Sequence, residues 1–213
     1  MGNAGADTLI GGDGDDLLVG GIGVDHYDGG NGSDTVSFFD ATAGIVIDLS
    51  TGGTINDDGF GNSETFTSIE NVEGSHFNDE ITGDAFANFL MGNDLIEGGG
   101  GADVLEGGEG ADVFIYGSLA DSGLGSMMRD VILDFQADGT DLIDIGLLVT
   151  GTFDFRTDGE GANFTGGGNT QARFNSETKI LEIDADGDAQ ADMEIEMQNV
   201  DGADLDETDF ITA

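Results

Sequence analysis

Residues 98–115 constrain the fold more than any other part of the chain. They form two consecutive nine-residue units, GGGGADVLE and GGEGADVFI, each reading G-G-x-G-x-D-x-U-x, where U is a large apolar residue. Glycine permits positive φ angles that residues with a Cβ avoid, and aspartate supplies the hard oxygen that Ca²⁺ prefers. The residues after the aspartate predict a short strand whose central side chain points inward. Each unit therefore predicts a calcium-binding turn followed by a strand.

More units of the same kind occur elsewhere. Residues 2–37 contain four without a gap, with Asp7, Asp16, Asp25 and Asp34 nine residues apart and Leu9, Leu18, Tyr27 and Val36 at the apolar position. A looser block, residues 74–91, supplies Asp79 and places Asn88 at the aspartate position. The spacing then shrinks to six residues before Asp94, and Asp94, Asp103 and Asp112 are again nine apart. Tandem copies in register predict a stacked solenoid.

These tandem units resemble the nonapeptide of repeats-in-toxin (RTX) proteins. The resemblance implies an all-β fold, a right-handed parallel β-roll, in which two units make one coil and residues eighteen apart are neighbours. It also implies several bound Ca²⁺ ions, placed between Asp7 and Asp25, between Asp16 and Asp34, and between Asp94 and Asp112. The predicted ligands are repeat aspartates and turn glycines, namely Asp7, Asp16, Asp25, Asp34, Asp79, Asp94, Asp103, Asp112, Gly12, Gly14, Gly21, Gly23, Gly30, Gly32, Gly99, Gly101, Gly108 and Gly110.

The period breaks over residues 38–73, which we interpret as an irregular insertion that continues the roll. Residues 44–49 (GIVIDL) and 67–72 (TSIENV) are predicted strands. The segment between them, residues 51–64, is rich in Gly, Asn, Asp and Ser and contains Asn56, Asp57, Asp58 and Glu64. A solvated loop is favoured there, and an additional calcium site is the alternative.

After Tyr116 the composition changes. Residues 130–135 and 141–145 are predicted strands, and the alternating segments 179–183 (KILEI) and 193–197 (MEIEM) predict an antiparallel hairpin. Its connection carries Asp184, Asp186 and Asp188, as in D-x-D-G-D calcium loops. Ile195 stands where an EF-hand has its glutamate, and the loop joins strands rather than helices. A calcium site and an acidic turn have equal weight here.

Residues 117–213 resemble the C-terminal domain that follows the roll in serralysin-type secreted metalloproteases. The resemblance rests on ADVFIY, RDVILDF, DLIDI, the hairpin DADGDAQADMEIEM, and the acidic-then-apolar end DETDFI. It implies a β-roll at residues 1–117 and a C-terminal β-rich capping domain at residues 118–213. In that family the end belongs to a secretion signal read by a type I (ABC) exporter. We therefore expect a protein secreted from a Gram-negative bacterium, with a catalytic or adhesive region N-terminal to this chain.

The charge balance limits the possible partners. The chain has 45 Asp and Glu against 4 Lys and Arg, a formal charge of −41. Such a chain repels itself and stays expanded until cations bind. Nucleic acids and anionic membranes are unfavourable partners, because both require basic patches. The chain has no cysteine, so calcium rather than disulfides would stabilise it. No segment reaches the roughly 18 apolar residues of a membrane span.

No motif in the sequence points to catalysis. The H-E-x-x-H zinc motif is absent, and the only histidines are His26 and His76, in unrelated repeats. We therefore expect this chain not to be an enzyme, although its parent protein could be one. The predicted function is calcium-triggered folding that supports type I secretion. The alternatives are a calcium-dependent surface or matrix protein and a polysaccharide-binding module of a secreted enzyme, the latter disfavoured by the shortage of basic residues.

Overall fold

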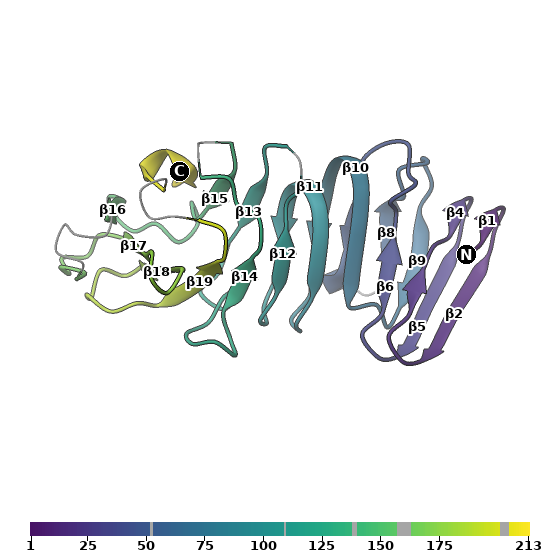
Figure 1. Ribbon diagram of the computed structural model, residues 1–213, viewed down its shortest axis with the longest axis horizontal. Coiled ribbons are helices and arrows are strands. Elements are labelled where there is room, and N and C mark those ends of the chain that lie inside the picture. The colour runs from purple at the N-terminus through teal and green to yellow at the C-terminus, as the bar shows by residue number, and fades with distance from the viewer. Residues whose placement is uncertain (52, 109, 138–139, 157–162, 201–204) are drawn as a thin grey trace.

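The protein is an elongated stack of short strands, and its N-terminal residues lie at one end of the long axis (Figure 1). The computed structural model describes residues 1–213 except 52, 109, 138–139, 157–162 and 201–204. The side chains of residues 51, 93 and 94 are also outside the described part. The N-terminal half contains β1 (Asn3–Ala4), β2 (Thr8–Asp13), β3 (Leu17–Leu18), β4 (Gly21–Ile22), β5 (His26–Asn31), β6 (Thr35–Ser37), β7 (Val46–Asp48), η1 (Leu49–Thr51), β8 (Thr54–Asp57), β9 (Glu64–Thr67), β10 (Asn71–Thr82) and β11 (Phe89–Glu97). The remainder contains β12 (Val104–Glu106), β13 (Val113–Ile115), β14 (Asp130–Ile132), β15 (Leu142–Asp144), β16 (Asp154–Arg156), β17 (Gln171–Asn175), β18 (Ile180–Asp184), β19 (Met193–Met197), η2 (Glu207–Asp209) and β20 (Phe210–Ile211).

The strands form two faces of a roll. On the first face, β3, β6, the first part of β10, the first part of β11, β12, β14 and β19 pair in parallel in that order. On the second face, β2, β5 and β9 pair in parallel, as do the later part of β10, the later part of β11, β13, β15 and β20. β10 and β11 each contribute to both faces. The predicted all-β parallel roll is therefore confirmed.

The coil length changes along the roll. In the N-terminal repeats Leu9 pairs with Tyr27 and Leu18 with Val36, so one coil spans the expected eighteen residues. Ile81 pairs with Ile96, because the coil containing the shortened spacing has lost three residues. Later coils are longer, and Phe114 pairs with Ile143. The stack keeps its register while its turns absorb deletions and insertions.

The insertion at residues 38–73 lies mainly on the second face. β9 continues the parallel stack from β5, and β8 pairs antiparallel with both β9 and β7, while β7 pairs in parallel with β10. The prediction of an open loop before Glu64 is wrong, because β8 lies inside it. The predicted strand 67–72 is also wrong in its middle, since β9 ends at Thr67 and β10 begins at Asn71. Ser68 has φ of 52°, which separates the two strands.

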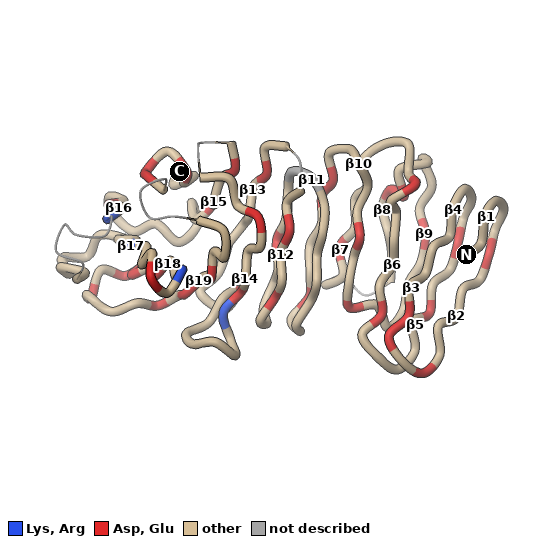
Figure 2. The backbone as a smooth tube through the Cα atoms, viewed as in Figure 1, with Lys and Arg blue, Asp and Glu red and all other residues tan. Residues whose placement is uncertain are grey.

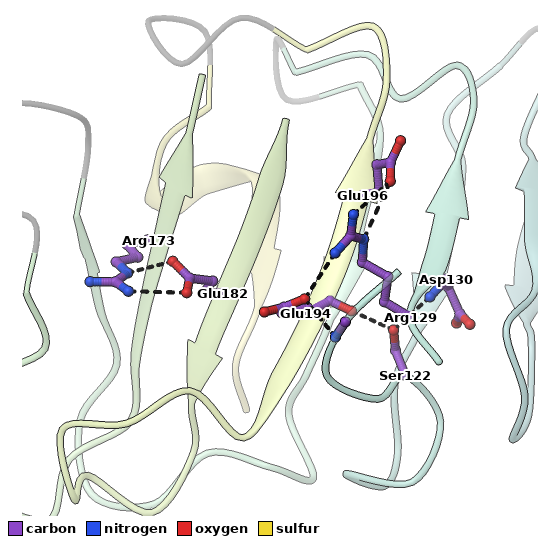
Figure 3. Close-up of polar contacts among 8 residues, drawn as sticks. Ser122, Arg129, Asp130, Arg173, Glu182, Glu194 and Glu196 are labelled. Carbon is purple, nitrogen blue, oxygen red and sulfur yellow. Dashed lines mark hydrogen bonds and ion pairs between the residues drawn. The ribbon is translucent and has the colours of Figure 1, made fainter. Parts of the chain in front are cut away.

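Beyond residue 117 the parallel stack continues through β14, β15, β19 and β20. The predicted hairpin is confirmed, since β18 pairs antiparallel with β19, and β17 and β16 extend this sheet. Figure 3 shows how Arg129, just before β14, donates to Glu194 and Glu196 on β19, with salt-bridge distances of 3.0 and 3.1 Å. The division of the chain into two domains at residue 117 stays a prediction.

The core is a single column of inward side chains. The apolar positions predicted from the repeats, including Leu9, Leu18, Tyr27, Val36, Ile81, Leu105 and Phe114, are all buried. Their neighbours in each strand point outward and are less buried, as β-strand geometry requires. In the described part of the chain, no helix has the length and apolar character needed to cross a membrane.

Candidate metal sites

Acidic residues, together with Asn88, form two rows along the roll, and each member stands one residue before a paired strand position. We call them the first and second acidic ladders. The first follows the first face and contains Asp16, Asp34, Glu70, Asn88, Asp103 and Asp130. The second follows the other face and contains Asp7, Asp25 and Glu64 before the insertion, and Asp79, Asp94, Asp112 and Asp141 after it. The parallel register therefore brings the repeat aspartates together coil by coil.

Each ladder is held by a repeated hydrogen bond. The backbone N–H of one member donates to a carboxylate oxygen of the corresponding member in the next coil. The bond recurs from Asp7 to Asp25 (2.8 Å), Asp16 to Asp34 (2.8 Å), Asp34 to Glu70 (2.9 Å), Asn88 to Asp103 (2.8 Å), Asp103 to Asp130 (2.9 Å) and Asp112 to Asp141 (3.1 Å). One oxygen of each accepting carboxylate is thereby fixed in direction.

The second oxygen of many ladder carboxylates has no hydrogen-bond donor. Among the described residues, the Oδ2 atoms of Asp7, Asp16, Asp25, Asp34, Asp103 and Asp130 are all buried in this way. A buried anionic oxygen without a partner is costly, and native structures satisfy such atoms with donors, water or ions. Hard anionic oxygens in rows are the ligands that Ca²⁺ prefers. The residues present therefore fit calcium.

Burial also changes the protonation of these carboxylates. Loss of solvent raises the pKa of Asp103 to about 7 and that of Asp130 to about 8. Burial likewise raises the pKa of Asp25, with the neighbouring Asp7 and Asp58 charges adding to the effect. The charged forms are thus unfavourable without a cation. A bound Ca²⁺ would stabilise them as carboxylates.

The predicted turn glycines have the backbone that the repeat requires. Gly12, Gly14, Gly21, Gly23, Gly30, Gly32, Gly99, Gly101, Gly108 and Gly110 all have positive φ. Successive coils also approach closely at these turns, since a Cβ on Gly30 would overlap the carbonyl of Gly12. The first glycine of a unit faces its own aspartate, and a Cβ on Gly11 would lie 2.7 Å from the Asp16 Oδ2 atom. Glycine therefore leaves room for both the carboxylate and the turn carbonyls.

Three other predicted ligands have different surroundings. Asp79 is buried, and its Oδ1 accepts from the backbone of Ile45 (2.9 Å) and the Ser75 hydroxyl (2.6 Å). Its Oδ2 accepts from the Ser75 backbone (2.8 Å), so protein donors already surround it. Asp112 is fully buried and lies in register with Asp141. The Asp94 backbone pairs with Asp79, but its side chain lies outside the described residues.

The acidic hairpin loop brings its three aspartates together. One carboxylate oxygen from each of Asp184, Asp186 and Asp188 lies within 4.8 Å of the others. Asp184 is buried and its oxygens accept from the backbone of Gly187 (2.8 Å) and Ala189 (2.9 Å), while Asp186 and Asp188 are exposed. These contacts build the turn itself. The choice between a calcium site and an acidic turn stays open.

Sequence reasoning missed four ladder members as site residues: Glu64, Glu70, Asp130 and Asp141. Glu64 was expected in a solvated loop, with an additional calcium site in that segment as the alternative, and it is buried, as is Asp58. A signal was present, because each of the four is followed two residues later by a large apolar residue, as in the repeat. None of the four has the full glycine set of the repeat, and Glu64 and Asp141 also fall outside the nine-residue period, although Glu70 and Asp130 fall on it.

Comparison with known proteins agrees with this geometry. Residues 1–36 and 90–122 match the family described as RTX calcium-binding nonapeptide repeat, with four copies. The chain therefore carries RTX calcium-binding repeats on an all-β, mostly parallel roll. The match ends at residue 122, so the expected serralysin-like C-terminal region stays a prediction.

Two solved structures are among those that match the chain. The R3 subunit of AlgE6, a mannuronan C5-epimerase from Azotobacter vinelandii, is 20% identical, with 100% of this chain and 81% of that chain covered and a TM-score of 0.35. The R2 subunit of the same enzyme is also 20% identical, with 96% and 92% covered and a TM-score of 0.37. No curated protein matches the chain significantly.

Proposed function

We propose that this chain is a calcium-binding module that folds when it meets Ca²⁺ outside the cell, and that it supports type I secretion and stability of a bacterial protein. The observation that carries the proposal is the set of buried ladder oxygens without donors. All four basic residues lie at or beyond residue 129, so no Lys or Arg accompanies the N-terminal repeats (Figure 2). Metal cations are the remaining way to neutralise these carboxylates in their charged form.

The expected energies are sufficient for a folding switch. Extracellular calcium modules have Kd values of about 10⁻⁴–10⁻³ M. A site at about tenfold excess of calcium over Kd contributes about 1.4 kcal/mol. Five or six such sites together contribute about 7–8 kcal/mol, which is comparable with the net stability of a whole domain. The chain would thus stay expanded in low-calcium cytosol and fold after export.

The segment expected to carry the secretion signal is part of the folded stack. Asp206 caps η2, and its carboxylate accepts from the backbone of Thr208 (2.7 Å). Phe210 in β20 is buried and its ring packs near Phe153 and Phe155, with centroid distances of 5.0 and 5.2 Å. We propose that a type I exporter reads this segment before folding, and that folding then covers it.

Two other functions remain as competing hypotheses, and we propose no catalytic activity for this chain. A surface or matrix protein would assemble through calcium between copies. A polysaccharide-binding module would need cationic side chains toward an anionic polymer, but Arg129, Arg156 and Arg173 are already paired with carboxylates. A pull-down on immobilised alginate and on neutral glycans would reveal the second alternative.

The deciding experiment compares the chain in millimolar calcium and in EGTA by light scattering and small-angle X-ray scattering. We expect a radius of gyration near ~17 Å when compact, somewhat more for an elongated roll, and ~50 Å when unfolded. An expanded chain in EGTA that becomes a compact monomer in calcium supports the proposal. Full compaction in EGTA at low salt contradicts it, and calcium-driven filaments favour the surface protein.

A further inference from the structure

The irregular insertion places a glutamate where the roll should have an aspartate. β9 pairs with β5 so that Thr65 stands opposite His26, and Glu64 therefore follows Asp25 in the second acidic ladder. The backbone of Thr65 also donates to the Asp25 carbonyl (3.2 Å), as His26 donates to Asp7 (3.0 Å) one coil earlier. Glu64 belongs to no nonapeptide unit, yet it completes the row.

Glu64 differs from the other ladder members in how its carboxylate is held. The side chain is 1% exposed, and neither Oε1 nor Oε2 has a hydrogen-bond partner. In contrast, the Glu70 carboxylate in the other ladder accepts the Asp34 backbone N–H. Both oxygens of the Glu64 carboxylate are therefore buried, and neither accepts the ladder hydrogen bond.

Other oxygen atoms converge on the same region. The Oδ2 atom of Asp25 is also buried without a partner. A Cβ built on Gly20 would overlap both this Asp25 atom and the Tyr27 hydroxyl. The Asp25 Oδ2 atom and the Tyr27 hydroxyl therefore both lie close to Gly20. Tyr27 and Asp58 lie near enough to influence the pKa of Glu64, although neither forms a hydrogen bond of good geometry with it.

The surroundings are negative and lack a compensating side chain. The carboxylate of Asp58 is 1% exposed and is held by the backbone of Phe60 (2.9 Å) and Asn62 (2.8 Å). Its charge adds to those of Asp25 and Glu64. No Lys or Arg occurs before residue 129, and the basic residues lie on C-terminal elements (Figure 2).

We propose that Glu64 and Asp25, beside the Tyr27 hydroxyl, form a divalent-cation site of the Ca²⁺ class that is additional to the nonapeptide sites. Glu64 can offer both oxygens to one ion, as glutamates in calcium loops do. An ion at this site would link the insertion to the preceding coil, because Glu64 lies in β9 of the insertion and Asp25 lies in the turn before β5. It rests on the proposed calcium-binding function, but one of its two carboxylates, that of Glu64, lies outside the nonapeptide units.

The first test counts bound calcium per folded chain by equilibrium dialysis with isotopic calcium. Glu64→Gln keeps the size of the side chain and removes its charge, and we expect it to bind one ion fewer than the unmodified chain. Glu177→Gln removes the same charge from an exposed residue and should bind the unmodified number. An equal count for Glu64→Gln and the unmodified chain overturns the inference.

A second test uses terbium, whose emission is excited by a nearby tyrosine. The chain has no tryptophan and only Tyr27 and Tyr116, so Tyr116→Phe leaves Tyr27 as the sole sensitiser. We expect strong emission from this variant and weaker emission when Glu64→Gln is added, the remainder coming from an ion between Asp7 and Asp25. No emission from Tyr116→Phe overturns the inference even if Glu64→Gln does not fold.

Failure of this site and failure of the proposed function are distinguishable. A chain that binds no calcium at all contradicts the proposed function. A chain that folds in calcium, but whose ion count and Tyr27-sensitised emission are unchanged by Glu64→Gln, contradicts only the additional site.

Discussion

At the scale of single residues, the turn glycines combine two separate requirements. Gly12 and Gly30 occupy the same repeat position in neighbouring coils, with φ of 109° and 104°. A Cβ on Gly12 would meet nothing within 4 Å, whereas a Cβ on Gly30 would overlap the Gly12 carbonyl. The pair therefore separates the cost of backbone conformation from the cost of close approach between coils.

We predict that Gly12→Ala lowers the free energy of unfolding by about 1–3 kcal/mol, because alanine disfavours positive φ. Gly30→Ala should cost clearly more, since the turn carbonyl of the preceding coil must also move. Urea denaturation of both variants in saturating calcium measures the difference. Equal losses of unfolding free energy in the two variants would mean that the Gly12 carbonyl does not pack tightly against Gly30.

A second prediction concerns Asp130, whose Oδ1 accepts from the Asp103 backbone (2.9 Å) while its Oδ2 has no donor. Asp130→Asn keeps an oxygen for this hydrogen bond and removes the anionic ligand. In calcium, loss of one ion should lower stability by about 1–2 kcal/mol. Without calcium the sign should reverse, because burial raises the pKa of Asp130 to about 8 and its charge is unfavourable there.

Thermal melting of Asp130→Asn in calcium, and small-angle X-ray scattering in EGTA as a measure of how far the calcium-free chain compacts, test this reversal. Asp40→Asn is the control, because Asp40 is exposed and belongs to neither ladder. A variant that is less stable in both conditions would show that Asp130 has a purely structural role.

At the scale of elements, the C-terminal sheet is joined to the roll by β14 and β19, strands separated by sixty residues of chain. Arg129 reinforces this joint, because its guanidinium is largely buried and bridges Glu194 and Glu196 (Figure 3). The Ser122 hydroxyl adds a further link by donating to the Glu194 carbonyl (2.5 Å) and accepting from the Asp130 backbone (2.8 Å).

We predict that Arg129→Ala destabilises this joint by about 1–2 kcal/mol. Hydrogen exchange should become faster in β14 and β19, while the N-terminal repeats keep their protection. Arg156→Ala is the matched control, because Arg156 pairs with Asp154 in its own strand (2.7 Å) and joins no distant elements. Uniform loss of protection along the whole roll would contradict a local role.

At the scale of the whole molecule, the coils stack one on another and acidic positions recur from coil to coil along the stack (Figure 2). Such a stack repels itself unless its charges are neutralised. Calcium can do this at neutral pH, and protons can do it in part at lower pH. Calcium ions, and protons when calcium is absent, should therefore both favour the compact form of the chain.

We predict that the calcium-free chain becomes more compact as the pH falls from about 8 toward about 4. Burial raises the folded-state pKa of Asp103 and Glu64 to about 7 and of Asp130 to about 8, above the values near 4 of an unfolded chain. A raised pKa means that the folded state binds protons more tightly, so stability is present at low pH and is lost as pH rises through these values.

Small-angle X-ray scattering across this pH range in EGTA measures the effect. In millimolar calcium the dependence should reverse, since protons then compete with the ions for the same oxygens. A calcium-free chain that expands on acidification would contradict this prediction.

The sequence by itself determined the repeating unit, because each nonapeptide contains its own turn glycines, its aspartate and its inward apolar residue. That local information predicted a stacked solenoid, the buried positions such as Leu105 and Phe114, and the positive φ angles of the turn glycines, while the resemblance to RTX repeats implied the parallel roll. It also predicted the hairpin of β18 and β19, because apolar and polar residues alternate along both segments. Each of these features depends on residues that are close together in the chain.

Only the tertiary structure decided which acidic residues outside the tandem glycine units join the ladders. Glu64, Glu70, Asp130 and Asp141 reach their rows through coils of unequal length, and strand register rather than sequence spacing brings them there. Burial also depends on the assembled stack, which is why Glu64 is an interior carboxylate and not part of a solvated loop. The physical reason is that parallel pairing aligns strands while leaving the length of each connecting turn free.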